Sequence, residues 1–249
     1  DLHDNTHSFP TRRSSDLDDD TPTASLALLT GTVDEDGVPN GLAGGIGDVA
    51  GAVTVAGGSV AGLFNSGADA PLTYALSLTT IATLSALNLT SGGAALSYVL
   101  VGDTVTASAN GAAVFTFQVS AAGAYTFTLI DQLDHATGAD ENDLLISLGG
   151  IITATDADGD LVTAAANGLV ITVDDDTPTA SLALLTGTVD EDGVPNGLAG
   201  GIGDVAGAVT VAGGSVTSLF NSGADAPLTY ALSLTTIATL SALNLTSGG

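Results

Sequence analysis

The sequence contains no cysteine, methionine, tryptophan or lysine, and apart from three histidines its only cationic side chains are Arg12 and Arg13. Without cysteine, neither disulfide bonds nor thiol chemistry is available. Lysine, cysteine and histidine are also the residues that most often act as nucleophiles or general bases in enzymes. We therefore assign no catalytic residue and expect a protein that is not an enzyme.

Positive charge is almost absent: 28 Asp and Glu residues stand against two Arg, which gives a formal charge of −26 and a pI near 4.1. A field of this sign repels nucleic acids and acidic membrane surfaces. Gly, Thr, Ser or Asp interrupts every apolar stretch, so we also expect no membrane insertion. Hydrophobic residues make up 45% of the chain, which is the normal share for a folded domain.

The first 17 residues differ from the rest of the chain. Residues 7–17 (HSFPTRRSSDL) contain both Arg residues and have no later counterpart. They resemble the translation of a sequencing adapter and lack the apolar region of a signal peptide, so residues 1–17 are interpreted as a non-native leader. A genuine basic arm is the alternative. In residues 18–249, His135 is the only side chain that can carry a positive charge.

A long repeat organises the remainder. Residues 18–93 recur at 174–249 with an offset of 156, and the copies differ only where Ala61-Gly62 becomes Thr217-Ser218. The chain thus holds one complete unit, 18–173, and the first half of a second, 174–249. Such a period is typical of whole domains in tandem. We expect an internal fragment of a longer protein, and a half unit that is unstable because it lacks counterparts of residues 94–173.

Within the unit, apolar and polar residues alternate as they do in half-buried strands. Such segments lie at 25–33, 72–78, 113–119, 125–130 and 169–173. Turn dipeptides between them, including Asn110-Gly111 and Asn167-Gly168, suit hairpins. The pattern predicts an all-β protein of antiparallel β-sandwich repeats in tandem, without helices. A unit of 156 residues exceeds the roughly 100 of a minimal sandwich, so either one elaborated sandwich or two small ones dividing near residue 94 is expected.

Acidic residues are concentrated in short clusters at the ends of the predicted strands. The clusters are Asp18, Asp19 and Asp20; Asp34, Glu35 and Asp36; Asp140, Glu141 and Asp143; Asp156, Asp158 and Asp160; and Asp174, Asp175 and Asp176.

Tracing the strands as a meander predicts where these clusters meet. The clusters at 34–36, 156–160 and 174–176 are expected at one end of the unit. The cluster at 140–143 is expected at the opposite end, near 18–20. This tracing requires that one strand continues through Gly149-Gly150.

Carboxylates gathered without cationic side chains oppose folding, and a hard divalent cation relieves the repulsion. Ca²⁺ accepts six to eight oxygen ligands from flexible loops, whereas Mg²⁺ demands stricter geometry and Zn²⁺ favours His or Cys. We therefore expect Ca²⁺ as the cofactor. Solvated turns are the competing interpretation, because Asp-Gly is an ordinary turn sequence. The EF-hand pattern and the glycine-rich calcium nonapeptide both fail here, and His135 is interpreted as structural.

Three motifs carry a resemblance to a known family. They are TLIDQLDHATGADENDLLI (128–146), ATDADGD (154–160) and ITVDDDTP (171–178), and they resemble the long acidic repeats of giant bacterial type I-secreted, RTX-type surface adhesins. The resemblance implies immunoglobulin-like domains strung into a stalk, with Ca²⁺ at the linkers, which fold after export. It implies that Asp174, Asp175 and Asp176, with Asp156, Asp158 and Asp160, are linker ligands.

The expected function is that of a calcium-stabilised extender in a secreted or cell-surface adhesin that supports cell adhesion or biofilm formation. Its expected partners are neighbouring units of the same chain, with any surface ligand bound by domains outside this sequence. One alternative is an adhesive module for a carbohydrate or host surface, although Tyr74, Tyr98 and Tyr125 lie within predicted strands. Another is a linker region of a secreted RTX toxin or hydrolase.

Overall fold

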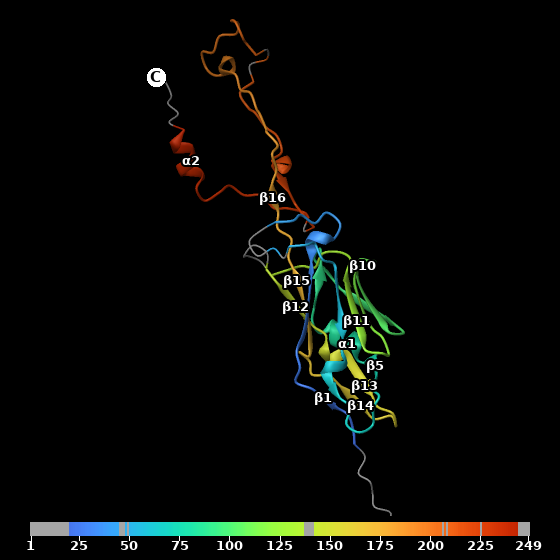
Figure 1. Ribbon diagram of the computed structural model, residues 1–249. Helices are drawn as coiled ribbons and strands as arrows, with labels where there is room; N and C mark the ends of the chain where they lie inside the picture. Colours follow the sequence, from blue (N-terminus) through green and yellow to red (C-terminus); the bar gives the residue numbers. More distant parts are fainter. Residues whose placement is uncertain are drawn as a thin grey trace, which may run out of the picture.

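The computed structural model describes residues 20–44, 48, 50–136, 142–205, 207, 209–224 and 226–243 (Figure 1). The predicted leader 1–17 lies outside these residues, as do Asp18, Asp19, Asp140 and Glu141. The elements of the first unit are β1 (Thr23–Ala24), β2 (Leu29–Asp34), η1 (Glu35–Gly37), β3 (Val55–Ser59), η2 (Ala61–Leu63), β4 (Phe64–Asn65), β5 (Thr73–Leu76), α1 (Thr80–Ser85), β6 (Thr90–Ser91), β7 (Ala94–Ala95), β8 (Ser97–Val101), β9 (Thr104–Ala109), β10 (Ala112–Val119), β11 (Ala124–Leu129), β12 (Leu144–Ser147), η3 (Gly149–Ile151), β13 (Ile152–Thr155), β14 (Leu161–Thr163) and β15 (Leu169–Asp174).

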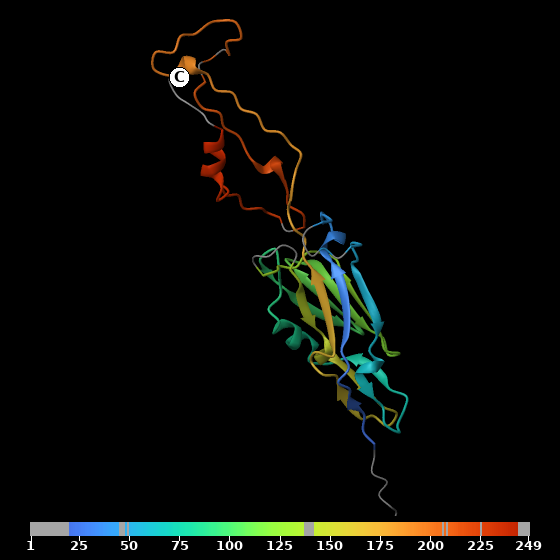
Figure 2. The same ribbon diagram turned by 60° about the vertical axis from the view of Figure 1, so that its left-hand side comes forward.

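Strands predominate, so the all-β class is confirmed. A five-stranded sheet has the order β3-β11-β10-β9-β8, and two three-stranded sheets have the orders β12-β15-β2 and β14-β13-β5. The short pairs β1-β4 and β6-β7 complete the unit. The β12-β15-β2 sheet lies against the five-stranded sheet in one half of the unit, and β13 and β14 lie in the other half (Figures 1 and 2).

Alternation along the strands builds the core. Phe115 and Phe117 of β10 and Phe127 of β11 are fully buried, and the rings of Phe115 and Phe127 stack with centroids 5.0 Å apart. The predicted hairpin at Asn110-Gly111 joins β9 to β10, with φ of 51° and 86° at these two residues. Positive φ at both central positions matches the right-handed twist of the paired strands.

Glycine permits the close approach of the two facing sheets. A Cβ atom on Gly31 of β2 would lie 2.9 Å from Ala56 Cβ in β3 and 3.0 Å from Ile171 Cδ1 in β15. Any larger residue would therefore push the layers apart. The buried hydrophobic side chains form one cluster, to which residues on both sides of position 94 contribute.

One strand pair departs from the antiparallel expectation. β15 pairs with β2 in parallel, with Leu169 opposite Leu29 and Asp174 opposite Asp34. Parallel strands end on the same side of a sheet, so the acidic residues that follow β2 and those that follow β15 emerge together. We call this side of the unit the β15 end.

The predicted course of the chain through residues 144–173 is wrong. β12 pairs with β15 but β13 pairs with β5, so the chain changes sheets at η3 and keeps its direction. Residues 164–168 make a second such crossing, with Gly168 N donating to Ala165 O at 2.8 Å. Asn167-Gly168 is therefore not a hairpin. As a result, residues 156–160 lie opposite to the β15 end of the unit, beside β1 (Figure 1).

The expectation of no helix is also wrong. The helix α1 contains the β-branched residues Thr80 and Ile81 and buries Leu84 completely. Six residues are too few to establish a helical period in the sequence, so tertiary burial of Leu84 decides the local structure. No helix in the described part of the chain is long and apolar enough to cross a membrane.

The second unit has nearly the same sequence but a different environment. Its elements are β16 (Thr179–Ala180), η4 (Glu191–Gly193), η5 (Thr217–Leu219), β17 (Phe220–Asn221) and α2 (Thr236–Ala242). Val33 is 0% exposed but its counterpart Val189 is 60% exposed, and Leu84 at 0% compares with Leu240 at 57%. The sequence supplies no second copy of residues 94–173 to cover these side chains.

Replacing Gly149 tests the sheet crossing. A Cβ atom there would lie 2.1 Å from Ala165 O and 2.6 Å from Gly168 N, whereas at Gly150 the nearest atom is 3.6 Å away. Overpacking against backbone cannot be relieved by a rotamer change, so Gly149→Ala should lower the free energy of unfolding by about 1–3 kcal/mol. Gly150→Ala should change it by less than about 0.5 kcal/mol in the same urea titration. Equal effects would contradict this account of the crossing.

Hydrogen exchange tests the exposure of the second unit. Backbone amides of β10 and β11 should be protected to the level of global unfolding, because they lie in a paired and buried sheet. Amides of residues 185–189 should exchange orders of magnitude faster than their counterparts in 29–33, which lie in β2. Protection of both copies to the same level would show that the half unit folds by itself.

Candidate functional site

The acidic β15 end is built by a tightly folded segment after β2. Asp34 caps η1 by accepting a 2.8 Å hydrogen bond from Asp36 N at its Oδ1 atom. The chain then folds back so closely that a Cβ atom on Gly41 would lie 2.2 Å from Glu35 O. From the other side, Asp34 N donates to Val53 O at 2.8 Å. These contacts bury carboxylates that would otherwise be solvated in a turn.

Four carboxylates gather on one side of this end, and we call Asp34, Asp36, Asp48 and Asp174 the Asp34 cluster. Oxygen atoms of Asp34, Asp48 and Asp174 lie within 4.8 Å of one another. Asp34 is 1% exposed and Asp174 2%. Asp34 Oδ2 and Asp36 Oδ1 are buried and have no hydrogen-bond partner among the described residues.

The pKa values in this cluster reflect burial and crowding. Desolvation is the largest cause and raises the pKa of Asp36 to about 6, with repulsion from Asp34 and Asp48 adding to it. Desolvation likewise raises the pKa of Asp34, against the hydrogen bond from Asp36 N. Both residues therefore pay a free-energy cost when they ionise in the folded state, and a bound cation would remove that cost.

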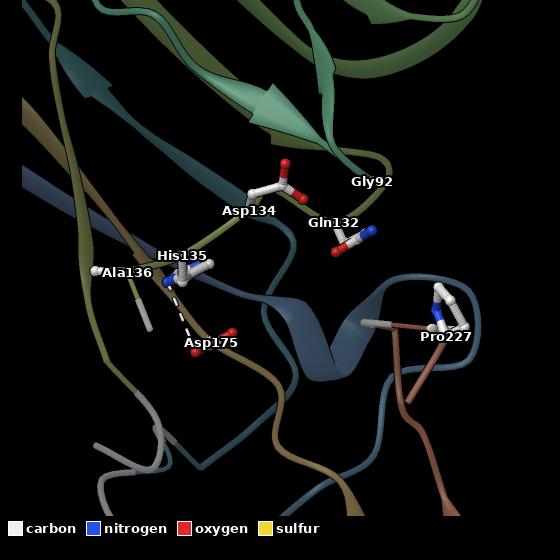
Figure 3. A pocket seen from close by; sticks show the side chains of 8 residues that line it. Gly92, Gln132, Asp134, His135, Ala136, Asp175 and Pro227 are labelled. Carbon is white, nitrogen blue, oxygen red and sulfur yellow. Dashed lines mark ion pairs between the residues drawn. The ribbon is translucent and has the colours of Figure 1, made fainter. Parts of the chain in front are cut away.

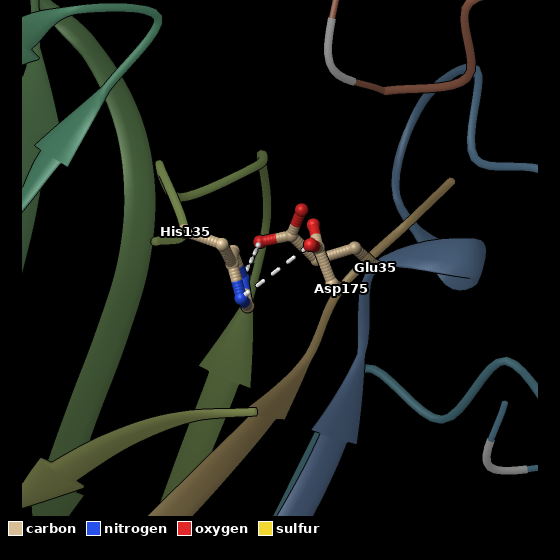
Figure 4. Close-up of side chains that lie close together, drawn as sticks. All are labelled: Glu35, His135 and Asp175. Atoms are coloured by element: carbon tan, nitrogen blue, oxygen red, sulfur yellow. Dashed lines mark hydrogen bonds and ion pairs between the residues drawn. The ribbon is translucent and has the colours of Figure 1, made fainter. Parts of the chain in front are cut away.

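A second group lies on the other side, and we call Glu35, His135 and Asp175 the His135 cluster (Figure 4). Alternation along β2 and β15 separates the two clusters, because adjacent residues of a strand point to opposite faces. His135 Nε2 lies 3.4 Å from Glu35 Oε1, and Glu35 is fully buried. Desolvation lowers the pKa of His135, but the contact with Glu35 outweighs it and raises that pKa to about 9.

Asp176 connects the first unit to the second. Its Oδ1 accepts a 3.2 Å hydrogen bond from Leu42 N, and its Oδ2 accepts one from Ala224 N. The same arrangement recurs one repeat earlier, where Asp20 Oδ2 accepts from Ala68 N at 2.7 Å. An aspartate at this place in the linker therefore holds the loop at 67–68, or at 223–224, of the unit that follows it.

The remaining predicted residues divide between the two ends. Asp156 Oδ1 accepts hydrogen bonds from Gly159 N and Asp160 N at 3.0 and 2.8 Å, and Asp156, Asp158 and Asp160 form a compact group. Although desolvation opposes it, hydrogen bonding within this turn lowers the pKa of Asp156. Ala157 N donates to Asp69 O at 3.2 Å, which places the turn beside the loop that Asp20 holds.

The predicted convergence of Asp34–Asp36 with Asp174–Asp176 is thus present in the structure. Two other placements are reversed. Residues 156–160 lie at the opposite end, and Asn142, which precedes Asp143, donates from Nδ2 to Asp175 Oδ2 at 3.2 Å, so these two residues lie at the β15 end. The reason is the pair of sheet crossings at η3 and residues 164–168.

Two site residues were not predicted. Asp48 joins the Asp34 cluster from the glycine-rich segment 44–48, whose single occurrence per unit argued against a calcium repeat. His135 was interpreted as structural. The sequence does contain a signal for its role, because His135 is the only side chain in residues 18–249 that can carry a positive charge, whereas the same residues contain many carboxylates.

A cavity of about 350 Å³ opens beside the His135 cluster (Figure 3). The residues that line it include Gly92, Gln132, Asp134, His135, Asp175 and Pro227. Pro227 belongs to the second unit, so the cavity lies at the boundary between the two units.

Comparison with known proteins places the chain in a family. The sequence pattern of the family described as Domain of unknown function (DUF5801) matches residues 19–167, and the chain belongs to this family. No curated protein and no solved structure matches the chain.

The raised pKa values predict an unusual pH dependence without metal. A carboxyl group whose folded pKa exceeds its unfolded value stabilises the fold at low pH and loses that contribution as pH rises. Asp34, Glu35, Asp36 and Asp176 all have raised pKa values. In EDTA, the free energy of unfolding should therefore fall between pH 4.5 and 7. His135 keeps its contribution up to its ordinary pKa of 6.5 and loses it only as pH rises towards 9, so it does not oppose this fall.

Two variants identify the source of this slope. Asp36→Asn should reduce it, because the amide cannot ionise. Asp103→Asn should leave it unchanged, because the pKa of Asp103 is lowered and this exposed residue stays ionised throughout the window. Urea titrations at several pH values measure the slope, and stability that rises towards pH 7 would refute the prediction.

Proposed function

We propose that the unit is a non-enzymatic extender of a secreted bacterial surface adhesin, folded as an immunoglobulin-like sandwich and stiffened by Ca²⁺ at its junctions. Three features support the proposal. The sequence repeats as whole units, the described sheets pack face to face over one core, and the acidic motifs resemble the stalk repeats of RTX-type adhesins. In such a protein each repeat adds length to the stalk, because a strand of about ten residues spans roughly 33 Å.

The observation that carries the proposal is the pair of buried, unpartnered oxygens in the Asp34 cluster. Buried carboxylates are normally paired with cations or hydrogen-bond donors. Here Asp34 Oδ2 and Asp36 Oδ1 have neither among the described residues, and no Lys or Arg exists in residues 18–249. The ligand atoms that this cluster offers are all carboxylate oxygens, and they come from a loop and from two strand ends. Such a set of ligands suits Ca²⁺. Asp34, Asp36, Asp48 and Asp174 would hold the ion.

The repeat brings further acidic groups to the same junction. Asp20 precedes the first unit and holds its loop in the same way as Asp176 precedes the second unit and holds the corresponding loop. Residues 156–160 lie beside the loop that Asp20 holds. In a tandem array, the turn at 156–160 of one unit would therefore approach the linker aspartates of the preceding unit. Ca²⁺ would then draw its ligands from two units and fix one against the other.

The aromatic side chains do not favour the carbohydrate-binding alternative. Sugar-binding sites commonly use exposed aromatic rings, but Tyr98 and Tyr125 are 8% and 5% exposed, and Tyr74 packs on Phe64 with ring centroids 5.8 Å apart. These rings belong to the core. The linker of an RTX toxin or hydrolase remains a second context for the same extender, and it would use the junctions in the same way.

Thermal unfolding of the whole chain tests the proposal. The melting temperature would be measured in EDTA, in CaCl₂, and in MgCl₂ at matched ionic strength. At 100 times Kd, one site contributes about 2.7 kcal/mol, which corresponds to roughly 5–10 °C for a unit of this size. The same melting temperature in all three solutions would show that the carboxylates are only solvated turn residues and would refute the proposal.

The second unit provides a matched control. Asp34→Asn with Asp36→Asn should abolish the Ca²⁺ response, and in EDTA this variant should be at least as stable as the parent because it removes repulsion. Asp190→Asn with Asp192→Asn changes the identical sequence 156 residues later, where Asp204 lies beside both residues but no β15 counterpart supplies the carboxylate that Asp174 gives to the Asp34 cluster. This second variant should keep the response. Loss of the response in both variants would contradict the assignment to the Asp34 cluster.

A further inference from the structure

The His135 cluster differs chemically from the Asp34 cluster. It contains an imidazole as well as two carboxylates, and one ligand atom from each of Glu35, His135 and Asp175 lies within 4.8 Å of the others (Figure 4). An imidazole nitrogen is a poor ligand for Ca²⁺ but a common one for first-row transition ions. The two clusters should therefore be considered separately.

The hydrogen bonds of His135 determine which of its nitrogens is available. Nδ1 lies 2.6 Å from the carbonyl oxygen of Asn142, which can only accept, so Nδ1 carries a proton. The lone pair of a neutral ring is then on Nε2, which faces Glu35 Oε1. Metal-binding histidines are usually held in this way, with the other ring N–H donating to a backbone carbonyl or a carboxylate.

The spacing between His135 and Glu35 also suits a shared ion. Nε2 and Glu35 Oε1 are 3.4 Å apart. This separation is long for a charge-assisted hydrogen bond, which is about 2.7–2.9 Å. It is close to the roughly 3.3 Å between two ligands of one tetrahedral ion whose bonds are about 2.0–2.1 Å.

The buried carboxylate supplies an independent indication of a ligand. Glu35 is 0% exposed, and its Oε1 accepts a 2.7 Å hydrogen bond from Leu133 N. Its Oε2 is buried and has no partner among the described residues. Burial of an oxygen without a partner is costly, and a cation beside it would remove the cost.

Space and access are also present. The cavity of about 350 Å³ adjoins His135 and Asp175, so water or a further ligand can reach an ion held there (Figure 3). With neutral imidazole, the two carboxylates balance the charge of a divalent ion. Without an ion, a proton on the imidazole supplies part of that charge.

We propose that Glu35, His135 and Asp175 form a second metal site, which binds a divalent transition ion such as Zn²⁺ through His135 Nε2 and the two carboxylates. This site is distinct from the calcium site of the Asp34 cluster. It faces the core side of the same strand ends and ties the segment that contains His135 to both β2 and β15.

The test uses the full chain with His3→Ala and His7→Ala, so that His135 is the only imidazole. Ca²⁺ is kept at saturation to occupy the oxygen-only sites, and Co²⁺ serves as the probe because its visible absorption reports nitrogen ligation and low coordination number. We expect one absorbing Co²⁺ per chain, displaced by one equivalent of Zn²⁺ and not by additional Ca²⁺. No absorbing complex, or displacement by Ca²⁺, would overturn the proposal.

Two variants assign the ligands. His135→Gln should weaken Zn²⁺ binding by more than the roughly 10- to 100-fold that loss of an outer partner costs. Asp134 lines the same cavity but is not a proposed ligand. The Asp134→Asn variant should therefore bind Zn²⁺ as the parent does. Unchanged Zn²⁺ affinity in His135→Gln would show that His135 is not a metal ligand and would overturn the proposal.

A measurement on the parent protein covers the case in which His135→Gln does not fold. The ¹⁵N chemical shift of His135 Nε2 should move on addition of one equivalent of Zn²⁺, while Nδ1 remains protonated. An Nε2 resonance that does not respond to Zn²⁺ would refute the site. The Ca²⁺ dependence of the melting temperature, compared between the parent and the Asp34→Asn with Asp36→Asn variant, reports on the Asp34 cluster, so failure of either site is recognised separately.

Discussion

The parallel pairing of β2 with β15 is the constraint on which the rest of the structure depends. It joins the first long strand of the unit to its last, and it ends with Asp34 opposite Asp174. Every later feature of the β15 end follows from this register. The ends of these two strands and the residues directly after them supply the carboxylates of both clusters except Asp48, and alternation at the strand ends directs neighbouring carboxylates to opposite sides. A slip of one residue would exchange the two sets and bury the wrong ones.

The strands themselves were predictable from the sequence, because alternation over 113–119, 125–130 and 169–173 is a local signal. The hairpin at Asn110-Gly111 was predictable for the same reason. The crossings at η3 and at residues 164–168 were not. Gly149-Gly150 is compatible with a continuing strand, a bulge or a turn, and the choice depends on contacts between Gly149 and residues 165–168 that are distant in sequence.

Part of the candidate site was predictable as well. The acidic triplets stand out because residues 18–249 contain no Lys or Arg, and the convergence of 34–36 with 174–176 followed from the position of each triplet at a strand end. The contribution of Asp48 depends on how the loop after η1 returns, which no local pattern reports. The role of His135 depends on the carbonyl of Asn142, a backbone group that sequence patterns do not distinguish from any other.

The direction of the chain through the unit has a mechanical consequence. The chain enters beside β1, passes up β2, and leaves from the end of β15 at Asp174. Tension applied along an array of such units would pull the start of β2 and the end of β15 in opposite directions. This loads the hydrogen bonds between the two strands in shear, so they resist together and do not open one at a time. The parallel pair that organises the acidic end is therefore also the element that would bear force.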